Sequence, residues 1–243
     1  INHDALLRKI GRTPYRRLIK QWLKSGVFDN KQFSNTVEGT PQGGVISPLL
    51  ANIALHGMEK CLEEYAETLP GGKRDNKQAL SLIRYADDFV ILHKDIKVVL
   101  EAKTVIQEWL NQVGLELKPE KTKIAHTLEE YEGITPGFDF LGFNIRQYKV
   151  KSTKLGFKTL IKPSSKSVKT HYRKLADICG NYKTVPTKAL IAKLNPVIRG
   201  WANYFSTKVS KSTFSKLDML LWKRLGQWAR SLASKQVSQM GQE

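Results

Sequence analysis

Cysteine is scarce in this sequence, and long apolar runs are missing. Among 243 residues there are 2 cysteines, Cys61 and Cys179, and they stand far apart. Such a pair matches neither a disulfide framework nor a set of zinc ligands, which favours a reducing compartment. No stretch reaches the roughly 18 apolar residues of a membrane-spanning helix, and no signal peptide opens the chain. We therefore expect neither a disulfide scaffold nor a membrane partner.

Acidic residues are scarce in the last two-fifths of the chain. The whole sequence has 40 Lys and Arg against 22 Asp and Glu, a formal net charge of +18. Residues 1–145 carry 19 of each sign, whereas residues 146–243 carry 21 basic and 3 acidic residues. Because the basic segment also contains Trp201, Trp222 and Trp228, it can bury a core and is expected to fold. This charge distribution predicts a polyanionic partner, most often nucleic acid.

Helix and strand signals alternate in the first part of the chain. Thr13-Pro14 and Ser47-Pro48 each place a capping residue before a proline, which predicts the start of a helix. Residues 80–93 are rich in β-forming residues around a central acidic pair, which predicts two strands joined by a tight two-residue turn. Residues 99–113 carry an apolar stripe with helical spacing, and Gly114 marks its end.

The second part changes from strands to helices. We expect a strand over residues 138–145 and a hairpin over residues 148–161 with Gly156 near its turn. From Pro163 onward, three amphipathic stretches predict a small helical bundle. The first helix is expected to be capped by Ser164 or Ser165. The second is expected to begin at Thr187 and to kink at Pro196, and the third to run from about Phe214 to Leu232.

Two adjacent acids, Asp87 and Asp88, stand between the apolar runs of residues 80–93. Paired carboxylates near a core are costly unless a cation compensates, and a hairpin tip would expose both on a rigid base. Carboxylate oxygens suit Mg²⁺, which accepts substrate phosphates as further ligands, and two such ions about 3.5–4 Å apart support phosphoryl transfer. An isolated Asp-Asp is more simply a turn, but in Tyr85-Ala86-Asp87-Asp88 between two apolar runs the catalytic interpretation is favoured.

The string Tyr85-Ala86-Asp87-Asp88 resembles the catalytic YADD box of reverse transcriptases, most closely the group II intron-encoded reverse transcriptase/maturases. Residues 39–53 are similar to the PQG block of the same family, and the two blocks occur in the family's order. Gly43-Gly44 allows close backbone approach to a ligand, and the Gln42 side chain can hydrogen-bond to template or incoming nucleotide. The resemblance implies that Asp87 and Asp88 hold two Mg²⁺ ions, and that Gln42, Gly43 and Tyr85 contact nucleotide or template.

Two weaker blocks follow in the family's order. Residues 114–123 resemble the block after the palm's second helix, which implies that Lys121 or Lys123 lies near the triphosphate. A solvated basic turn is the alternative. Residues 138–143 resemble the FLGF block, which implies a primer grip at Phe140, Leu141 and Gly142. The alternative there is an ordinary core strand with a bulge at Gly142.

Residues 161–168 and 196–205 resemble the thumb, or maturase X domain, of the family. A thumb holds the template–primer duplex by its phosphates, and in maturases it also grips structured intron RNA, tasks that suit helices with one lysine-rich face. For a single lysine a solvated surface charge is the better interpretation, but not for the net excess. The implied RNA-binding residues are Lys162, Lys166, Lys169, Arg173, Lys174 and Arg199.

The resemblance implies an α+β fold, a right-hand polymerase palm with an antiparallel sheet and helices, followed by an α-helical thumb bundle. We expect a partial palm over residues 1–145, a connecting β-hairpin over residues 146–162 and a helical thumb or X domain over residues 163–243. The family also has fingers and a third catalytic carboxylate, which we expect upstream of residue 1. The 243-residue chain alone is therefore not expected to polymerise DNA.

The resemblance implies an RNA-directed DNA polymerase and maturase that binds group II intron RNA, assists splicing and supports intron mobility by target-primed cDNA synthesis. Its expected partners are the intron RNA, a template–primer duplex, target DNA, dNTPs and Mg²⁺, in a ribonucleoprotein of the bacterial cytoplasm. One alternative is an RNA-binding splicing cofactor without polymerase activity, although such a binder has no need of the paired acids. A reverse transcriptase of another bacterial retroelement is a second alternative, against which the long basic C-terminal segment argues.

Overall fold

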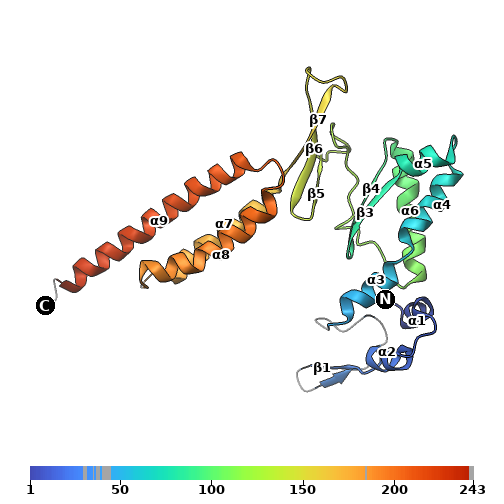
Figure 1. The fold of residues 1–243 in the computed structure, drawn as a ribbon, viewed down its shortest axis with the longest axis horizontal. Coiled ribbons are helices and arrows are strands. Elements are labelled where there is room, and N and C mark those ends of the chain that lie inside the picture. Colours follow the sequence, from blue (N-terminus) through green and yellow to red (C-terminus); the bar gives the residue numbers. More distant parts are fainter. Residues whose placement is uncertain (30–31, 35, 37–38, 40–44, 184, 241–243) are drawn as a thin grey trace. The chain divides into compact units, whose positions relative to one another are not determined.

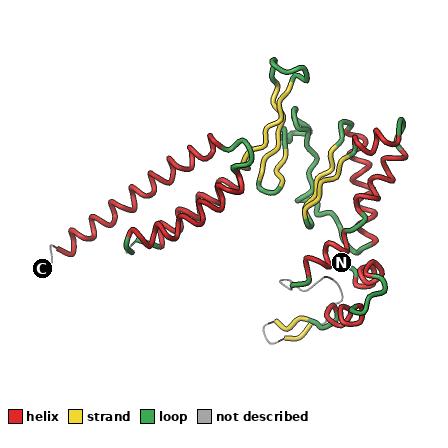
Figure 2. The backbone as a smooth tube through the Cα atoms, in the orientation of Figure 1, coloured by secondary structure: helices red, strands yellow, loops and turns green. Residues whose placement is uncertain are grey.

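The computed structural model of the protein describes residues 1–29, 32–34, 36, 39, 45–183 and 185–240. The chain divides into two compact units, unit 1 (Ile1–Lys123) and unit 2 (Ile124–Glu243). Figure 1 labels their helices and strands, and Figure 2 distinguishes helix, strand and loop along the chain. Each unit has a hydrophobic core of its own.

Unit 1 is mainly helical, with two short hairpins. Its strands form the separate antiparallel pairs β1-β2 and β3-β4. The helices are α1 (His3–Ile10), α2 (Arg16–Leu23), α3 (Ser47–Leu55), α4 (Met58–Thr68), α5 (Lys73–Ala79) and α6 (Ile96–Gln112). The strands are β1 (Val27–Asp29), β2 (Gln32–Ser34), β3 (Ser81–Tyr85) and β4 (Asp88–Leu92).

The predicted helix starts in unit 1 are partly confirmed. Helix α3 begins at Ser47, with Pro48 in its first turn, as the sequence predicts. Helix α2 begins at Arg16, two residues after Thr13-Pro14, and its first turn has no side-chain cap. The stripe predicted over residues 99–113 belongs to α6, which begins earlier because the Asp95 side chain accepts a hydrogen bond from Lys97 N at 2.9 Å.

The larger core of unit 1 lies between α4 and α6. Ala102, Ile106 and Leu110 are four residues apart on α6, so they form one buried face, and Met58 and Leu62 of α4 pack against it. Side chains of the β3-β4 hairpin cover the same core, namely Leu82, Phe89 and Ile91. A second core joins α1, α2 and α3 through Leu6, Leu7, Ile19, Leu23, Leu50 and Ala54.

The end of α6 is fastened to the start of α1. Asn2 N donates to Val113 O at 2.9 Å, while the Asn2 side chain accepts a hydrogen bond from Ala5 N and caps α1. Gly114 follows with φ +71°, and a Cβ at this position would lie 2.7 Å from Asn2 N. Both the left-handed backbone and the close approach therefore require glycine here.

Unit 2 joins a three-stranded sheet to three long helices. The sheet is antiparallel, with the order β5-β6-β7. Its elements are β5 (Phe138–Phe140), β6 (Phe143–Lys149), β7 (Phe157–Pro163), α7 (Ser165–Asn181), α8 (Thr187–Phe205) and α9 (Lys211–Met240). The expected hairpin is present, but its strands extend further than residues 148–161.

The strand predicted over residues 138–145 is interrupted. Leu141 and Gly142 have positive φ values of 49° and 79°, so the chain turns between β5 and β6. The expectation of one strand was wrong. An apolar leucine rarely adopts a left-handed conformation, so the residue type at position 141 did not predict a turn.

The helical bundle of unit 2 follows the predicted pattern. The Ser164 side chain accepts a hydrogen bond from Ser167 N at 3.1 Å and caps α7, whose Leu175 and Cys179 are buried against Leu190 and Trp228. Helix α8 begins at Thr187 and continues through Pro196, and α9 extends to Met240, beyond the expected end at Leu232.

The mixed α/β architecture, with small antiparallel sheets and a separate helical region, confirms the predicted α+β class. The division into three domains at residues 145 and 162 stays a prediction, since the two compact units divide after Lys123. Within the described part of the chain, no helix is both long and apolar enough to cross a membrane.

Gly114→Ala should destabilise unit 1 more than Gly11→Ala does. Both glycines have left-handed backbones, with φ +71° and +68°, but a Cβ at Gly11 meets no atom within 4 Å. We expect Gly11→Ala to lower the free energy of unfolding by about 1–2 kcal/mol, and Gly114→Ala by about 1–3 kcal/mol more because of overpacking. Urea unfolding measures both, and equal decreases would contradict the proposed tight contact with Asn2.

Candidate active site and nucleic-acid interface

The paired acids lie at the tip of the β3-β4 hairpin. Tyr85 pairs with Asp88, so the two residues of the turn are Ala86 and Asp87, and Asp88 is the first residue of β4. The expected two-residue turn is present, one position earlier than the Asp-Asp pair. Both carboxylates are exposed, as is the Tyr85 ring. The arrangement presents two adjacent anionic groups to solvent on a base packed against the α4-α6 core.

The Arg84 side chain stabilises the turn by hydrogen bonds. One guanidinium nitrogen, Nη1, donates to Ala86 O at 3.0 Å and to Asn52 Oδ1 of α3 at 3.1 Å. Arg84 Nε lies 3.7 Å from Glu59 Oε1 of α4, a long ion pair, and has no hydrogen-bond partner among the described residues. The side chain is 15% exposed, so one nearly buried cation connects the turn to two helices. Ala86 has φ 53°, a conformation that costs about 1–2 kcal/mol for a residue with a Cβ, and the bond from Arg84 helps to hold it.

The helix that Arg84 reaches is formed by the second half of the PQG block. Gln42 and Gly43, the nucleotide-binding or template-binding residues predicted in that block, lie outside the described residues. Helix α3 starts within the block, at Ser47, and Asn52 lies about one and a half turns into it. The structure therefore links the second half of one sequence block to the turn of the other.

The donor atoms of the turn fit part of a Mg²⁺ site. Asp87 and Asp88 supply carboxylate oxygens, the ligand type that Mg²⁺ prefers, and their exposure leaves room for water and phosphate ligands. Among the residues with described positions, no group of three or more His, Cys, Asp or Glu side chains could hold a metal ion. Among the described residues, the pair therefore amounts to only part of a possible ligand set.

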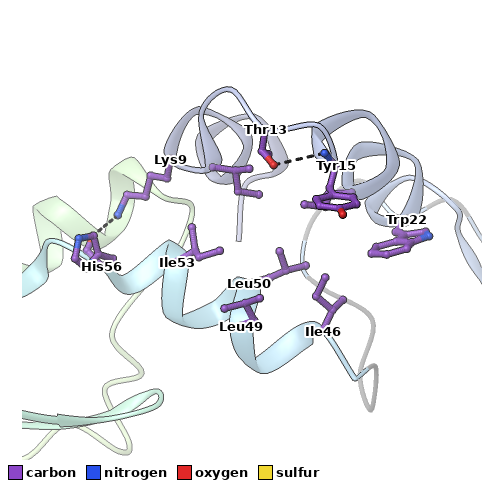
Figure 3. A pocket seen from close by; sticks show the side chains of 11 residues that line it. Lys9, Thr13, Tyr15, Trp22, Ile46, Leu49, Leu50, Ile53 and His56 are labelled. Carbon is purple, nitrogen blue, oxygen red and sulfur yellow. Dashed lines mark hydrogen bonds between the residues drawn. The ribbon is translucent and has the colours of Figure 1, made fainter.

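Helix α3 also borders an open apolar groove of about 730 Å³ between α1, α2 and α3 (Figure 3). Ile46, Leu49 and Ile53 line it from α3 and the residue before it, and Tyr15 and Trp22 line it from the α2 side. At one end, Lys9 Nζ donates to the backbone oxygens of Ala54 and His56 at 2.6 and 2.8 Å, and burial lowers the pKa of Lys9. Neither acid of the hairpin lines this groove, so it does not belong to the candidate catalytic turn.

Lys121, predicted to lie near the triphosphate, is exposed in a turn after α6. Lys121 N and Thr122 N both donate to Lys118 O, at 3.0 and 2.9 Å, which closes the turn. No hydrogen bond or ion pair described for Lys121 joins its side chain to the catalytic hairpin. Its placement agrees equally with the solvated basic turn and with a free cation that meets phosphate.

The predicted primer grip is a tight turn anchored on the helices of unit 2. The Tyr204 hydroxyl of α8 donates to Leu141 O at 2.9 Å, and Ser164 N, before α7, donates to Gly142 O at 2.8 Å. A Cβ on Gly142 would lie 3.3 Å from Phe205 Cζ, a tight approach in addition to its positive φ. Residues 140–142 thus form an anchored turn and not a bulge within a continuous strand.

The predicted RNA-binding residues are mostly exposed. Lys166, Lys169 and Arg173 are spaced at three and four residues on α7, opposite its buried face of Leu175 and Cys179. Lys174 and Arg199 are exposed as well. Lys162 differs, because it is half-buried in β7 with Nζ 5.0 Å from the centre of the Tyr148 ring.

Arg84, Asn52 and Tyr204 were missed from the sequence as parts of these sites. An arginine within the apolar run of β3 was the available signal for Arg84, since a cation in such a place needs partners. For Asn52 and Tyr204 no local signal exists, because their partners lie 32 and 63 residues away along the chain.

Comparison with protein families assigns both parts of the chain. Residues 1–145 match the model described as reverse transcriptase (RNA-dependent DNA polymerase). Residues 168–240 match the model of the group II intron, maturase-specific domain. The first match alone covers more than half of the chain.

Curated relatives point the same way. Protein YkfC of Escherichia coli K12 is 33% identical over 166 residues, covering 58% of this chain and 41% of the relative. The group II intron-encoded protein LtrA of Lactococcus lactis subsp. cremoris is 32% identical over 206 residues, covering 60% of this chain and 33% of the relative.

An uncharacterized 91 kDa protein in the cob intron of Schizosaccharomyces pombe is 24% identical over 284 residues, covering 88% of this chain and 34% of the relative. The chain thus spans between a third and about two-fifths of the length of these relatives. With both family models matched, the chain belongs to the reverse transcriptases, as a group II intron reverse transcriptase/maturase.

Proposed function

We propose that the protein is the palm and thumb part of an RNA-directed DNA polymerase that also acts as a group II intron maturase. The observation that carries this proposal is the exposed Asp87-Asp88 turn, tied to α3 by Arg84, in a chain that also contains a maturase-specific domain. A splicing cofactor without polymerase activity would gain nothing from two exposed acids on a supported turn.

In this proposal Asp87 and Asp88 hold Mg²⁺ and are the catalytic residues. Bound Mg²⁺ would activate the primer 3′-hydroxyl and stabilise the departing pyrophosphate. Tyr85, next to the acids and 66% exposed, would contact the incoming nucleotide. Gln42 and Gly43 would position template or nucleotide, Lys121 would meet the triphosphate, and the turn at Phe140, Leu141 and Gly142 would hold the primer end.

Arg84 acts here as a positioning residue. Its guanidinium fixes the carbonyl of Ala86, the residue immediately before Asp87, so it restrains where the acids point. Its bond to Asn52 fixes the same turn relative to α3, the helix that the PQG block opens. Metal-dependent phosphoryl transfer is sensitive to placement, and a displacement of about 1 Å can cost about a hundredfold in rate.

The basic part would bind RNA. Exposed cations on one face of α7, with Arg199 and Lys162, would contact phosphates of the intron RNA and of the template–primer duplex. The relative LtrA is described as a group II intron-encoded protein, which supports splicing assistance and intron mobility by target-primed synthesis at a DNA target. A ribonucleoprotein in the bacterial cytoplasm is the setting that we propose.

Replacing either acid by its amide in the full-length protein should remove DNA synthesis and spare RNA binding. We expect Asp87→Asn and Asp88→Asn to lower primer extension about a thousandfold, since bound metal contributes several kcal/mol to the transition state. Asp75→Asn, at an acid in the first turn of α5, is the control and should keep wild-type activity. Primer extension that survives in both hairpin variants would contradict the metal assignment, and a wild-type protein that assists splicing but extends no primer would favour the cofactor alternative.

Arg84→Lys should lower kcat for primer extension by about tenfold to a hundredfold with little change in KM for dNTP. Lysine keeps the charge but lacks the planar fork with which the guanidinium spans Ala86 O, Asn52 and Glu59. Arg74→Lys on α5 is the matched control. A kcat within about twofold of wild type, or a decrease in RNA affinity together with kcat, would rule out a positioning role.

Neutralising Lys166, Lys169 and Lys174 together should flatten the salt dependence of intron RNA affinity. The slope of log Kd against log salt should fall by about 0.7–0.9 for each phosphate that the variant no longer neutralises. Lys77→Gln is the control, because Lys77 Nζ already pairs with Glu67 at 2.6 Å. An unchanged slope in the triple variant would show that α7 does not touch phosphate.

A further inference from the structure

One face of the β6-β7 hairpin carries Lys162 together with two cations, Arg146 and Lys158, that the functional assignment has not used. In the register of the two strands, Tyr148 lies opposite Lys158, and Arg146 lies opposite Leu160. Directly opposite residues point to the same side of a sheet, and residues two apart on one strand share that side. We call this surface the Tyr148 face, and it consists of Asn144, Arg146, Tyr148, Lys158, Leu160 and Lys162.

The Tyr148 ring holds two of these cations in place. Arg146 Cζ and Lys162 Nζ each lie 5.0 Å from the ring centre, within the range of a cation–π interaction. Arg146 Nε is buried without a hydrogen-bond partner among the described residues, so the ring and not a carboxylate restrains this side chain. Long cationic side chains lose rotamer freedom when they bind a ligand, and cations that are already restrained lose less.

The cations on this face are not neutralised within unit 2. No ion pair among the described residues involves Arg146, Lys158 or Lys162. Asp139 is the carboxylate that the register of β5 and β6 places on this side, and it accepts a hydrogen bond from Asn144 Nδ2 at 2.8 Å. Positive charge therefore remains free towards the hairpin tip.

The other side of the hairpin serves the core of unit 2 and local pairing. Phe143 packs against Tyr204 and Phe205, with ring centres 5.3 and 4.7 Å away. Lys149, on that same side, pairs with Glu129 at 3.0 Å. The two sides thus differ in kind, one being packed and paired while the other carries unpaired cations.

We propose that the Tyr148 face binds the phosphodiester backbone of nucleic acid. Arg146 and Lys162 provide phosphate contacts restrained by the ring, and exposed Lys158 provides a third. Charge complementarity selects the partner, since residues 124–243 contain 21 Lys and Arg against 7 Asp and Glu. Arg146 offers a planar fork of donors that suits phosphate oxygens. This inference rests on the proposed nucleic-acid binding and extends it from the helices and Lys162 to the whole of this hairpin face.

The test uses the full-length protein and measures Kd against salt concentration for two probes, a template–primer duplex and the intron RNA. Arg146→Gln, Lys158→Gln and Lys162→Gln should each reduce the log–log slope by about 0.7–0.9 for at least one probe. Lys149→Gln is the matched control on the same hairpin, and its slope should equal that of the wild type. The probe that responds identifies which nucleic acid this face holds.

Tyr148→Leu separates restraint from charge. It leaves every cation in place, so the slope should stay at the wild-type value, while Kd should rise about twofold to fivefold for each cation released. Tyr148→Phe keeps the ring and should bind like the wild type. Thermal unfolding of each variant checks that the hairpin is folded.

Slopes that match Lys149→Gln in all three glutamine variants would overturn the proposal, as would an unchanged Kd in Tyr148→Leu. Neither result depends on catalysis, because only binding is measured. If the Asp87 variants are inactive and the glutamine variants have unchanged slopes, the polymerase proposal stands and phosphate binding by the Tyr148 face is rejected. If the glutamine variants have reduced slopes and the Asp87 variants are fully active, phosphate binding by the Tyr148 face stands and the metal assignment is rejected.

Discussion

The packing of α4 against α6 is the interaction on which the candidate catalytic turn depends. A hairpin of two five-residue strands is marginal in water by itself, and β3-β4 is stable here because Leu82, Phe89 and Ile91 cover the core between the two helices. That burial leaves the tip free to expose Asp87 and Asp88. Arg84 then adds direction, since it ties the tip to α3 by way of Asn52. The α4-α6 core stabilises the hairpin, and Arg84 fixes the position of its tip.

In the proposed function, residues 1–145 and residues 146–243 have opposite electrostatic requirements. A palm has to concentrate Mg²⁺, so a neutral balance with two exposed acids suits it better than a uniformly positive surface. A thumb and an X domain have to hold long polyanions, and a surplus of exposed cations lowers the free energy of that binding through counterion release. The cations on α7 and on the Tyr148 face lie on elements whose other sides form the core of unit 2, so charge and packing do not compete for the same positions.

Features set by neighbouring residues could be predicted from the sequence, and features set by distant residues could not. The β3-β4 hairpin, the start of α3 at Ser47 and the Ser164 cap of α7 follow from local patterns. The turn at Leu141 and Gly142 does not, because the bond that holds it comes from Tyr204, 63 residues away. In the same way, the sequence shows Arg84 as a cation within an apolar strand, but it does not predict its partner Asn52, which is 32 residues away. The assigned roles of the site residues stay predictions that the structure allows.

The bond from Tyr204 to Leu141 has a mechanical consequence. Tyr204 lies near the end of α8, which packs with α7 and α9, and Ser164 fastens the same turn to the start of α7. The turn is therefore fixed to two helices at once. In the proposed function, the loop that would hold the primer end and the helices that would bind RNA thus belong to one packed unit.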